Sequence, residues 1–272
     1  MQVYLSADIE GTCGIADWSE TERSTPQDYR PFQAQMTREV CAACQGTLAA
    51  GAEGILLKDA HDSARNIDPT QLPAQTRILR GWTGDPLSMM AGLDAGHFGA
   101  VLFTGYHAWA ACPGNPLSHT MNLGNEYVAI NGVRASEFLL NSYTAGYYGV
   151  PVAFLSGDRE LCAFAQDWLP GLVAVPVNEG RGGGVLSMHP QAAVEAIRAG
   201  AEEAVRRLRA GGAGMSVPLP QRFAATVRYK EHKDAYRRSF YPGARLEDGK
   251  NVCFDSDDWY EMLRYFHFVL SD

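Results

Sequence analysis

Five short and nearly unbroken apolar runs constrain the fold of this 272-residue chain more than any other feature of its sequence. These runs occupy residues 3–6, 54–58, 100–104, 152–156 and 173–177. Runs of this length without polar alternation are typical of strands that are covered on both faces, as in a parallel sheet. Helical periodicity lies between them, as in the series Met36, Val40, Ala43 and Thr47. The sequence therefore predicts an α/β fold with a mainly parallel sheet flanked by helices.

The pattern changes after about residue 210. Residues 210–220 are rich in Gly and Pro, which is typical of a linker. Beyond them, apolar and polar residues alternate from Phe223 to Tyr229, as in a half-buried strand, and a last helix is expected to begin at Asp258. We expect an α/β metal-binding catalytic domain over residues 1–210, and a smaller α+β portion over residues 215–272 packed on it.

Net charge and hydropathy exclude some partners. The chain carries 23 Lys and Arg against 31 Asp and Glu, a formal charge of -8, so it lacks the basic excess that nucleic-acid binding requires. No apolar run has the length that a membrane span needs, and the first residues do not follow the pattern of a secretory signal. We therefore expect a cytoplasmic protein without a nucleic-acid or membrane partner.

The six cysteines are expected to be reduced thiols, because nothing in the sequence indicates secretion. The spacing Cys41-x-x-Cys44 matches half of a zinc site or a redox pair. However, no second motif of this kind is present, and the pair lies within an Ala-rich helical pattern. We interpret it as two small side chains that face the core.

Ligands of open α/β sheets bind beyond the carboxyl ends of the strands, so the residues that follow each predicted strand are the first candidates for a binding site. Asp8 and Glu10 follow the first run and would share one face if the strand continued. Two adjacent carboxylates repel each other unless a cation or a proton intervenes. Gly11 then allows a sharp turn. Taken alone, the motif is better explained by a solvated turn.

Histidines follow two further runs, and an acid follows a tight-turn signal. His61 comes after the second run, where Asp59 or Asp62 could orient its ring. His107 comes after the third run, and His119 lies beyond a turn rich in Pro and Gly. Glu137 follows the turn signal at residues 131–132 and lies in the first turn of a predicted helix, where an acid also complements the helix dipole.

A set of Asp, Glu and His without Cys suits zinc, manganese or a similar divalent ion. Three acids and two histidines are too many ligands for one tetrahedral zinc that must keep an open position. The set fits a two-metal site with a shared carboxylate.

The ordered motifs resemble those of the DppA-type D-aminopeptidases, a family of zinc metallopeptidases. The matching segments are residues 6–11, 58–61, 105–108, 118–121, 131–137, 145–148 and 157–158. The resemblance is strong over residues 1–170 and looser beyond them. One departure is the glycine-rich segment 178–184, where the family pattern leads one to expect a basic residue and Ser.

The resemblance implies a role for each matching residue. Asp8 would be shared by two zinc ions per subunit, with Glu10 and His61 on one ion and His107 and Glu137 on the other. His119 matches the histidine that the family treats as catalytic. The family forms ring-shaped decamers, so a homo-oligomer of this kind is expected here.

The sequence therefore predicts a zinc-dependent aminopeptidase that hydrolyses the N-terminal residue of short peptides, D-amino acid peptides in particular. The main alternative is another two-metal hydrolase, a phosphoesterase or a cyclic-amide hydrolase, because the same ligand types serve those reactions. A ring-forming metal-binding protein without catalysis is a further alternative. A cysteine hydrolase would have to use Cys112.

Overall fold

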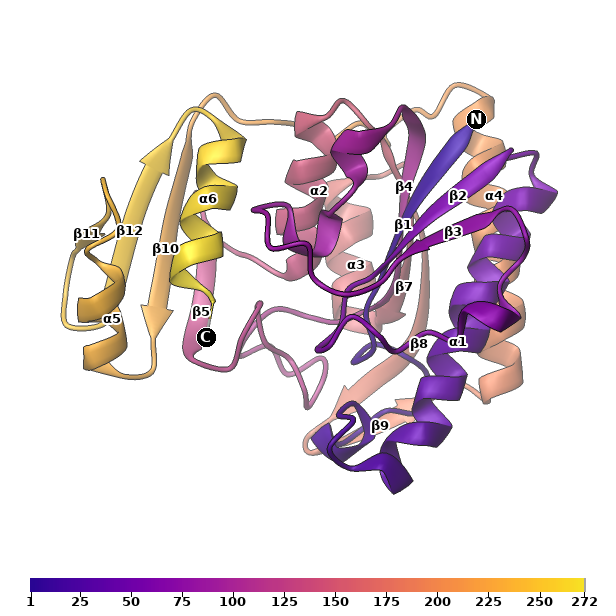
Figure 1. Ribbon diagram of the computed structural model, residues 1–272, viewed down its shortest axis with the longest axis horizontal. Coiled ribbons are helices and arrows are strands. Elements are labelled where there is room, and N and C mark those ends of the chain that lie inside the picture. Colours follow the sequence, from indigo (N-terminus) through magenta and orange to yellow (C-terminus); the bar gives the residue numbers. More distant parts are fainter. Residues whose placement is uncertain (272) are drawn as a thin grey trace.

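The computed structural model describes residues 1–271, and within them a seven-stranded sheet has the strand order β3-β2-β1-β4-β7-β8-β9 (Figure 1). Its strands are β1 Gln2–Ala7, β2 Gly54–Asp59, β3 Thr76–Leu79, β4 Phe98–Tyr106, β7 Val152–Asp158, β8 Val173–Arg181 and β9 Gly184–Ser187. Neighbouring strands are parallel except for β8 and β9. The five predicted strands and the mainly parallel sheet are thereby confirmed, whereas the short strands β3 and β9 were not predicted.

Helices cover both faces of this sheet, which explains the nearly unbroken apolar runs of its central strands. On one face, α1 (Pro26–Ala49) and α4 (Pro190–Arg209) pack on Val3 and Leu5 of β1. On the other face, α2 (Glu137–Tyr147) and α3 (Arg159–Trp168) pack in the same core as Tyr4. Helix α1 begins ten residues before Met36, at a proline in a position that suits a helix start.

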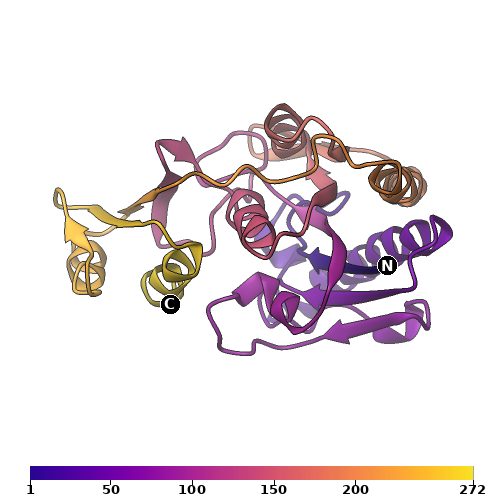
Figure 2. The same cartoon turned by 90° about the horizontal axis from the view of Figure 1, so that it is seen from above.

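A second, antiparallel sheet of five strands in the described residues extends from the first part of the molecule (Figure 2). Its order is β11 (Arg245–Leu246), β12 (Asn251–Ser256), β10 (Phe223–Tyr229), β5 (Asn125–Ile130) and β6 (Val133–Arg134). Two helices accompany it, α5 (His232–Arg238) and α6 (Trp259–Val269). Strands β5 and β6 come from residues expected to lie in the α/β domain. The division of the chain near residue 210 stays a prediction.

Helix α2 lies between the two sheets and contributes to both hydrophobic cores (Figure 1). Phe138 packs with the core of the parallel sheet. Leu139, Leu140 and Tyr143 pack with the antiparallel sheet and α6. The first residue of this helix is Glu137, so both cores fix the position of that carboxylate.

Four short 3-10 helices complete the described secondary structure. They span Trp18–Glu20, Pro69–Gln71, Ser88–Met90 and Leu93–Ala95. None of the helices in residues 1–271 combines the length and the hydrophobicity that crossing a bilayer would require. The six cysteines form no disulfide in the described chain. Cys44 is in the core as expected, whereas Cys41 is only half-buried and its thiol donates to the Gln71 carbonyl.

Glu39 is a buried carboxylate on α1, with 1% of its surface exposed. Its Oε1 accepts hydrogen bonds from the Cys13 amide at 3.0 Å and from the Gln35 side chain at 2.8 Å. Its Oε2 has no partner among the described residues. Burial raises the pKa of Glu39 to about 7 despite these hydrogen bonds. The folded state therefore binds this proton more tightly than the unfolded chain does.

We expect Glu39 to destabilise the fold progressively as pH rises from about 4.5 through about 7, by roughly 3 kcal/mol in total. The variant Glu39→Gln lacks the charge, so its advantage over the wild type should be small at pH 5 and largest at pH 8. Denaturant unfolding of both proteins at the two pH values measures the difference. The exposed Glu160 provides the control Glu160→Gln, and a pH-independent difference for Glu39→Gln would contradict the prediction.

Candidate metal centre

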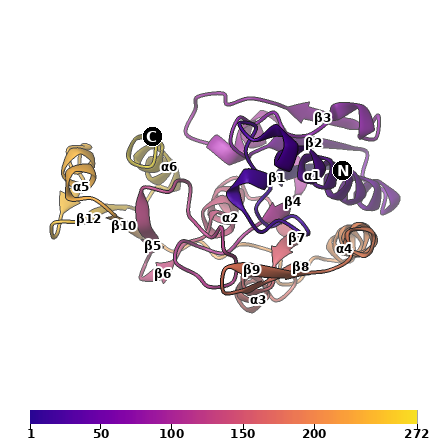
Figure 3. The same ribbon diagram turned by 90° about the horizontal axis from the view of Figure 1, so that it is seen from below.

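The candidate residues follow the carboxyl ends of adjacent parallel strands, which Figure 3 views from below. Asp8 follows β1, His61 follows β2 and His107 follows β4. The order of the strands reverses between β1 and β4. Strands β2 and β3 lie on one side of β1, and strands β4, β7 and β8 lie on its other side. Such a switch point leaves a crevice between the loops that follow the two strands.

Two glycines allow the loops after β1 and β4 to meet. A Cβ on Gly11 would lie 1.9 Å from the Tyr106 carbonyl oxygen, and one on Gly105 would lie 2.2 Å from the Asp8 carbonyl oxygen. The Gly11 amide donates to the Gly105 carbonyl at 2.8 Å, and Gly105 has a φ of 68°. Any side chain at either position would push Asp8 away from His107.

Asp8 is at the centre of the cluster, with one carboxylate oxygen facing each side. Its Oδ1 lies 3.3 Å from His61 Nδ1, and its Oδ2 lies 3.6 Å from His107 Nε2. Glu10 Oε2 lies 3.2 Å from His61 Nδ1 on the first side. Glu137 Oε2 lies 3.4 Å from His107 Nε2 on the second side. Folding thus brings all five predicted ligands together, as two groups that share Asp8.

In His61 and His107, the ring nitrogen that faces away from the cluster, here called the outward nitrogen, contacts a backbone carbonyl. His61 Nε2 contacts the Thr21 carbonyl at 3.0 Å, and His107 Nδ1 contacts the Ala108 carbonyl at 2.9 Å. A carbonyl only accepts, so the outward nitrogen carries the proton and the inward nitrogen is left as a ligand. Neither Asp59 nor Asp62 orients His61. Asp59 instead accepts from the amides of Asn66 and Ile67.

Several inward atoms of this cluster have no hydrogen-bond partner within residues 1–271. They are Asp8 Oδ2, Glu10 Oε2 and His107 Nε2, all buried. Buried polar atoms are usually satisfied, so this concentration needs an explanation. Donor atoms of Asp8, Glu10 and His61 lie within 4.8 Å of one another, as do those of Asp8, His107 and Glu137. These oxygen and nitrogen donors fit zinc.

The charges in the cluster shift the pKa values of its own side chains. Burial and the nearby Glu10 carboxylate raise the pKa of Asp8. Burial alone would lower the pKa of His107, but Glu137 outweighs it and raises this pKa to about 10. Burial would raise the pKa of Glu137, which His107 instead lowers to about 2. Protons and a metal ion would therefore compete for the same atoms.

His119 lies on the loop between β4 and β5 and borders both halves of the cluster. Its Nε2 is 3.6 Å from Glu137 Oε1 and 4.0 Å from Glu10 Oε1. Its ring stacks on His107, with 4.3 Å between the centroids, and meets the Trp18 ring edge-on at 5.4 Å. Burial and His107 lower the pKa of His119. Its Nδ1 contacts the Leu117 carbonyl at 2.9 Å, so Nε2 faces the cluster without a proton.

A cavity of about 470 Å³ opens over the cluster, and we call it the metal cavity. Its volume is within the range of roughly 300–1,000 Å³ that is typical of small-molecule sites. Acids line it, and no described Lys or Arg does. Lys58 is buried on β2, where its ammonium donates to the Gly81 carbonyl and lies over the Trp82 ring. Arg159 pairs with Glu179.

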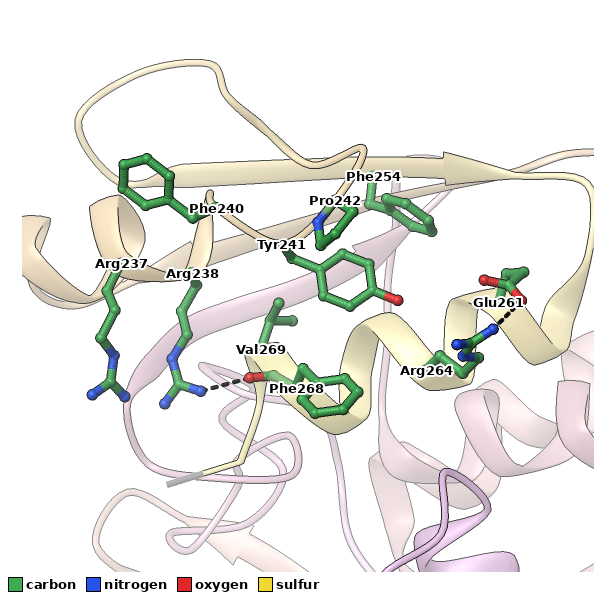
Figure 4. Close-up of a pocket in the computed structure, with 10 residues that line it drawn as sticks. All are labelled: Arg237, Arg238, Phe240, Tyr241, Pro242, Phe254, Glu261, Arg264, Phe268 and Val269. Carbon is green, nitrogen blue, oxygen red and sulfur yellow. Dashed lines mark hydrogen bonds and ion pairs between the residues drawn. The ribbon is translucent and has the colours of Figure 1, made fainter.

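A larger cavity of about 650 Å³ lies elsewhere, beside α5 and α6 (Figure 4). Arg237, Arg238 and Arg264 line it together with aromatic rings. Arg238 donates to the Phe268 carbonyl, and Arg264 pairs with Glu261. Among the described residues, its lining contains no histidine and one acid, Glu261. This cavity therefore lacks the donors of a metal site, and size alone does not identify the functional pocket.

Three residues that support the cluster were not predicted. Thr21 orients His61 through its carbonyl, and Trp18 contacts His119. The Asn115 side chain donates to the Glu10 carbonyl at 3.0 Å. Trp18 begins a 3-10 helix of three residues and Thr21 is its C-cap, in a segment too short for periodicity to reveal. Asn115 lies in the turn rich in Pro and Gly, and its position there was the only available signal.

The chain is similar to known proteins over nearly its whole length. The family model for peptidase family M55, described as D-aminopeptidase, matches residues 1–268. A D-aminopeptidase from Bacillus subtilis (strain 168) is 28% identical over 265 residues, which cover 96% of this chain and 93% of the relative. A solved structure described as the Zn-dependent D-aminopeptidase DppA from Bacillus subtilis, a self-compartmentalizing protease, matches with a TM-score of 0.90 and 26% identity. That match covers 99% of this chain and 96% of the other.

Proposed function

The chain belongs to the D-aminopeptidase family of peptidases, family M55, and on that premise we propose that it removes the N-terminal residue of short peptides, D-amino acid peptides in particular, at a two-zinc centre. Membership makes it a zinc-dependent metallopeptidase. The observation that carries the finer proposal is the position of Asp8 between two groups of donor atoms.

In this proposal, Asp8, Glu10 and His61 hold one zinc ion, and Asp8, His107 and Glu137 hold the other. Zinc, when bound, polarises a carbonyl oxygen and lowers the pKa of a bound water to about 7. The carbonyls of Thr21 and Ala108 would hold the proton of each neutral imidazole on the nitrogen that faces away from the cluster, so that a zinc ion could displace the proton from the other nitrogen of His61 and His107. The Met121 amide holds Glu137 Oε1 at 2.6 Å, which fixes that carboxylate in turn.

His119 is the proposed proton-transfer residue. Its Nδ1–H is held by the Leu117 carbonyl, so Nε2 is free to accept a proton from the attacking water. The same nitrogen then returns the proton to the leaving amine. The rings of Trp18 and His107 restrict the imidazole on its edge and its face, which keeps it in position throughout.

The charge of the metal cavity supports an amine-bearing substrate over a phosphate ester. Glu22 and Asp62 line the cavity beyond the cluster, and no described cation lines it. A phosphoesterase needs Arg or Lys to hold the charge of its substrate. A free α-ammonium group is instead attracted by these acids. The remaining alternative is a cyclic-amide hydrolase, which would act on substrates without a free amine.

We expect the purified protein to contain two zinc ions per chain and to hydrolyse D-alanyl-D-alanine faster than L-alanyl-L-alanine. Elemental analysis and a dipeptide assay before and after chelation measure both quantities. Chelation should abolish turnover, and added zinc should restore it. A cyclic amide and a generic phosphate ester are the control substrates. Turnover of either control without turnover of the dipeptides would contradict the proposal.

We also propose that copies of the chain assemble into a ring-shaped decamer in the cytoplasm. The description of the solved relative as self-compartmentalizing supports a closed assembly. Light scattering after size-exclusion chromatography measures the number of copies. A monomer at micromolar concentration would contradict this part of the proposal.

A further inference from the structure

His119 borders a second cavity in addition to the metal cavity. This outer cavity has a volume of about 370 Å³ and shares His119, Asn122 and Leu123 with the metal cavity. The side chain that we propose as the proton-transfer residue therefore lines both cavities. A peptide whose scissile bond lies at His119 would extend from one cavity into the other.

The wall between the cavities is held by backbone and amide hydrogen bonds. The Asn122 side chain donates to the Leu270 carbonyl at 2.6 Å, and its oxygen accepts from the Gly124 amide at 2.9 Å. The Gly124 carbonyl in turn accepts from the Lys230 amide at 3.0 Å. Lys230 directly follows β10 and lines the outer cavity. Its backbone is thus connected to the loop that carries His119.

The two cavities differ in charge. The metal cavity is lined by Asp8, Glu10, Glu22, Asp62 and Glu137, and by no described cation. The outer cavity is lined by one acid and one base, Glu126 and Lys230. The Glu126 carboxylate is bound by two cations, Arg228 Nε at 2.7 Å and Lys250 Nζ at 3.0 Å.

The Lys230 side chain is exposed and forms no ion pair within residues 1–271. The uncompensated charge of the outer cavity is therefore positive. In the metal cavity, Glu22 and Asp62 are the two lining acids that are not proposed zinc ligands, and their charge is negative. A short peptide carries the complementary pair of charges, an ammonium group at its first residue and a carboxylate at its last. The opposite orientation would place the carboxylate in the cavity that contains Glu22 and Asp62.

We propose that Lys230 is a specificity-determining residue, which binds the C-terminal carboxylate of a short peptide whose N-terminal residue lies in the metal cavity. This inference rests on the proposed function and deepens it. The outer cavity has room for only a short segment beyond the scissile bond, so the preferred substrates are dipeptides and tripeptides with a free carboxylate. Longer peptides and C-terminal amides lose this contact.

The test compares D-alanyl-D-alanine with D-alanyl-D-alaninamide, because the two differ only in the terminal charge. In Lys230→Met the KM for the dipeptide should rise about fivefold, with kcat within about twofold. The KM for the amide should not change. Lys230→Arg should restore the KM for the dipeptide. Lys233→Met, at an exposed lysine three residues on, is the control and should change neither substrate.

Equilibrium binding separates this inference from the proposed function. Calorimetry on zinc-loaded His119→Ala protein, with and without Lys230→Met, should show the same fivefold loss for the dipeptide alone. Peptide binding or turnover that does not depend on Lys230 overturns the inference and leaves the proposed function intact. Absence of turnover together with Lys230-dependent binding overturns the proposed function alone. Absence of binding by both peptides overturns the inference as well.

Discussion

Asp8→Asn should reduce the zinc content from about two ions per chain to near zero and abolish peptide hydrolysis. Asp8 presents one oxygen to each half of the cluster, so loss of its charge weakens both halves at once. The loss of kcat/KM should exceed the roughly 10- to 100-fold that follows removal of a residue that only orients a ligand. Elemental analysis and the dipeptide assay measure the two effects.

The asparagine is chosen because it preserves the local turn. Asp8 Oδ1 accepts from the Ile9 amide at 2.9 Å, and an amide oxygen can still accept that hydrogen bond. Glu137→Gln is the matched control, because Glu137 contacts only one half of the cluster. It should retain about one zinc ion per chain. Equal zinc contents in the two variants would contradict the shared role of Asp8.

His119→Ala should lower kcat by about 10²- to 10⁴-fold, the usual contribution of general acid–base catalysis, while the zinc content stays unchanged. The reason is the position of its Nε2, which faces the cluster from the cavity side. This nitrogen carries no proton, so it can accept one from the attacking water. Steady-state kinetics and elemental analysis on the same preparation measure both quantities.

His97→Ala is the control for this variant, because His97 is exposed and lies outside the metal cavity. Unchanged turnover in His119→Ala would remove His119 from the proposed mechanism. Loss of zinc in His119→Ala would also contradict the proposed role of His119. Donor atoms of Glu10, His107 and His119 lie within 4.8 Å of one another, so these residues could hold a metal ion. His119 would then be a ligand.

The strands that could be predicted from the sequence are those buried on both faces. Strands β1 and β7 are buried on both faces, and Leu5 and Phe154 are examples of their buried residues. Because neither face meets solvent, apolar residues do not alternate with polar ones along these strands. The short edge strands β3 and β9 carry half-buried residues and leave no such pattern. Helix α3 was missed because Asp158 is both the last residue of β7 and the N-cap of the helix, without a loop between them.

The antiparallel sheet was predicted only in part. The alternation from Phe223 to Tyr229 identified β10, but its partner β5 lies about 90 residues earlier in the chain. Pairing between Ala225 and Ile130 depends on the whole fold, and no local signal specifies it. For this reason residues 125–134 were expected to belong to the parallel sheet region.

The candidate site was predictable where side chains follow buried strands. Asp8, His61 and His107 stand directly after such strands, so the general rule for open sheets located them. The contacts of Thr21 and Ala108 were not predictable, because every residue has a carbonyl and only the fold decides which one faces a ring. His119 could be separated from the other loop histidines only through its resemblance to a family.

The late pairing of β5 has a consequence for synthesis on the ribosome. His119 precedes β5 and Glu137 follows β6, yet β5 has only the two-residue β6 as a partner until β10 is made. A growing chain that already contains every proposed zinc ligand therefore lacks β10, the strand that pairs with β5 in the segment between His119 and Glu137. We therefore expect metal loading to follow the emergence of nearly the whole polypeptide, which would couple cofactor acquisition to completion of translation.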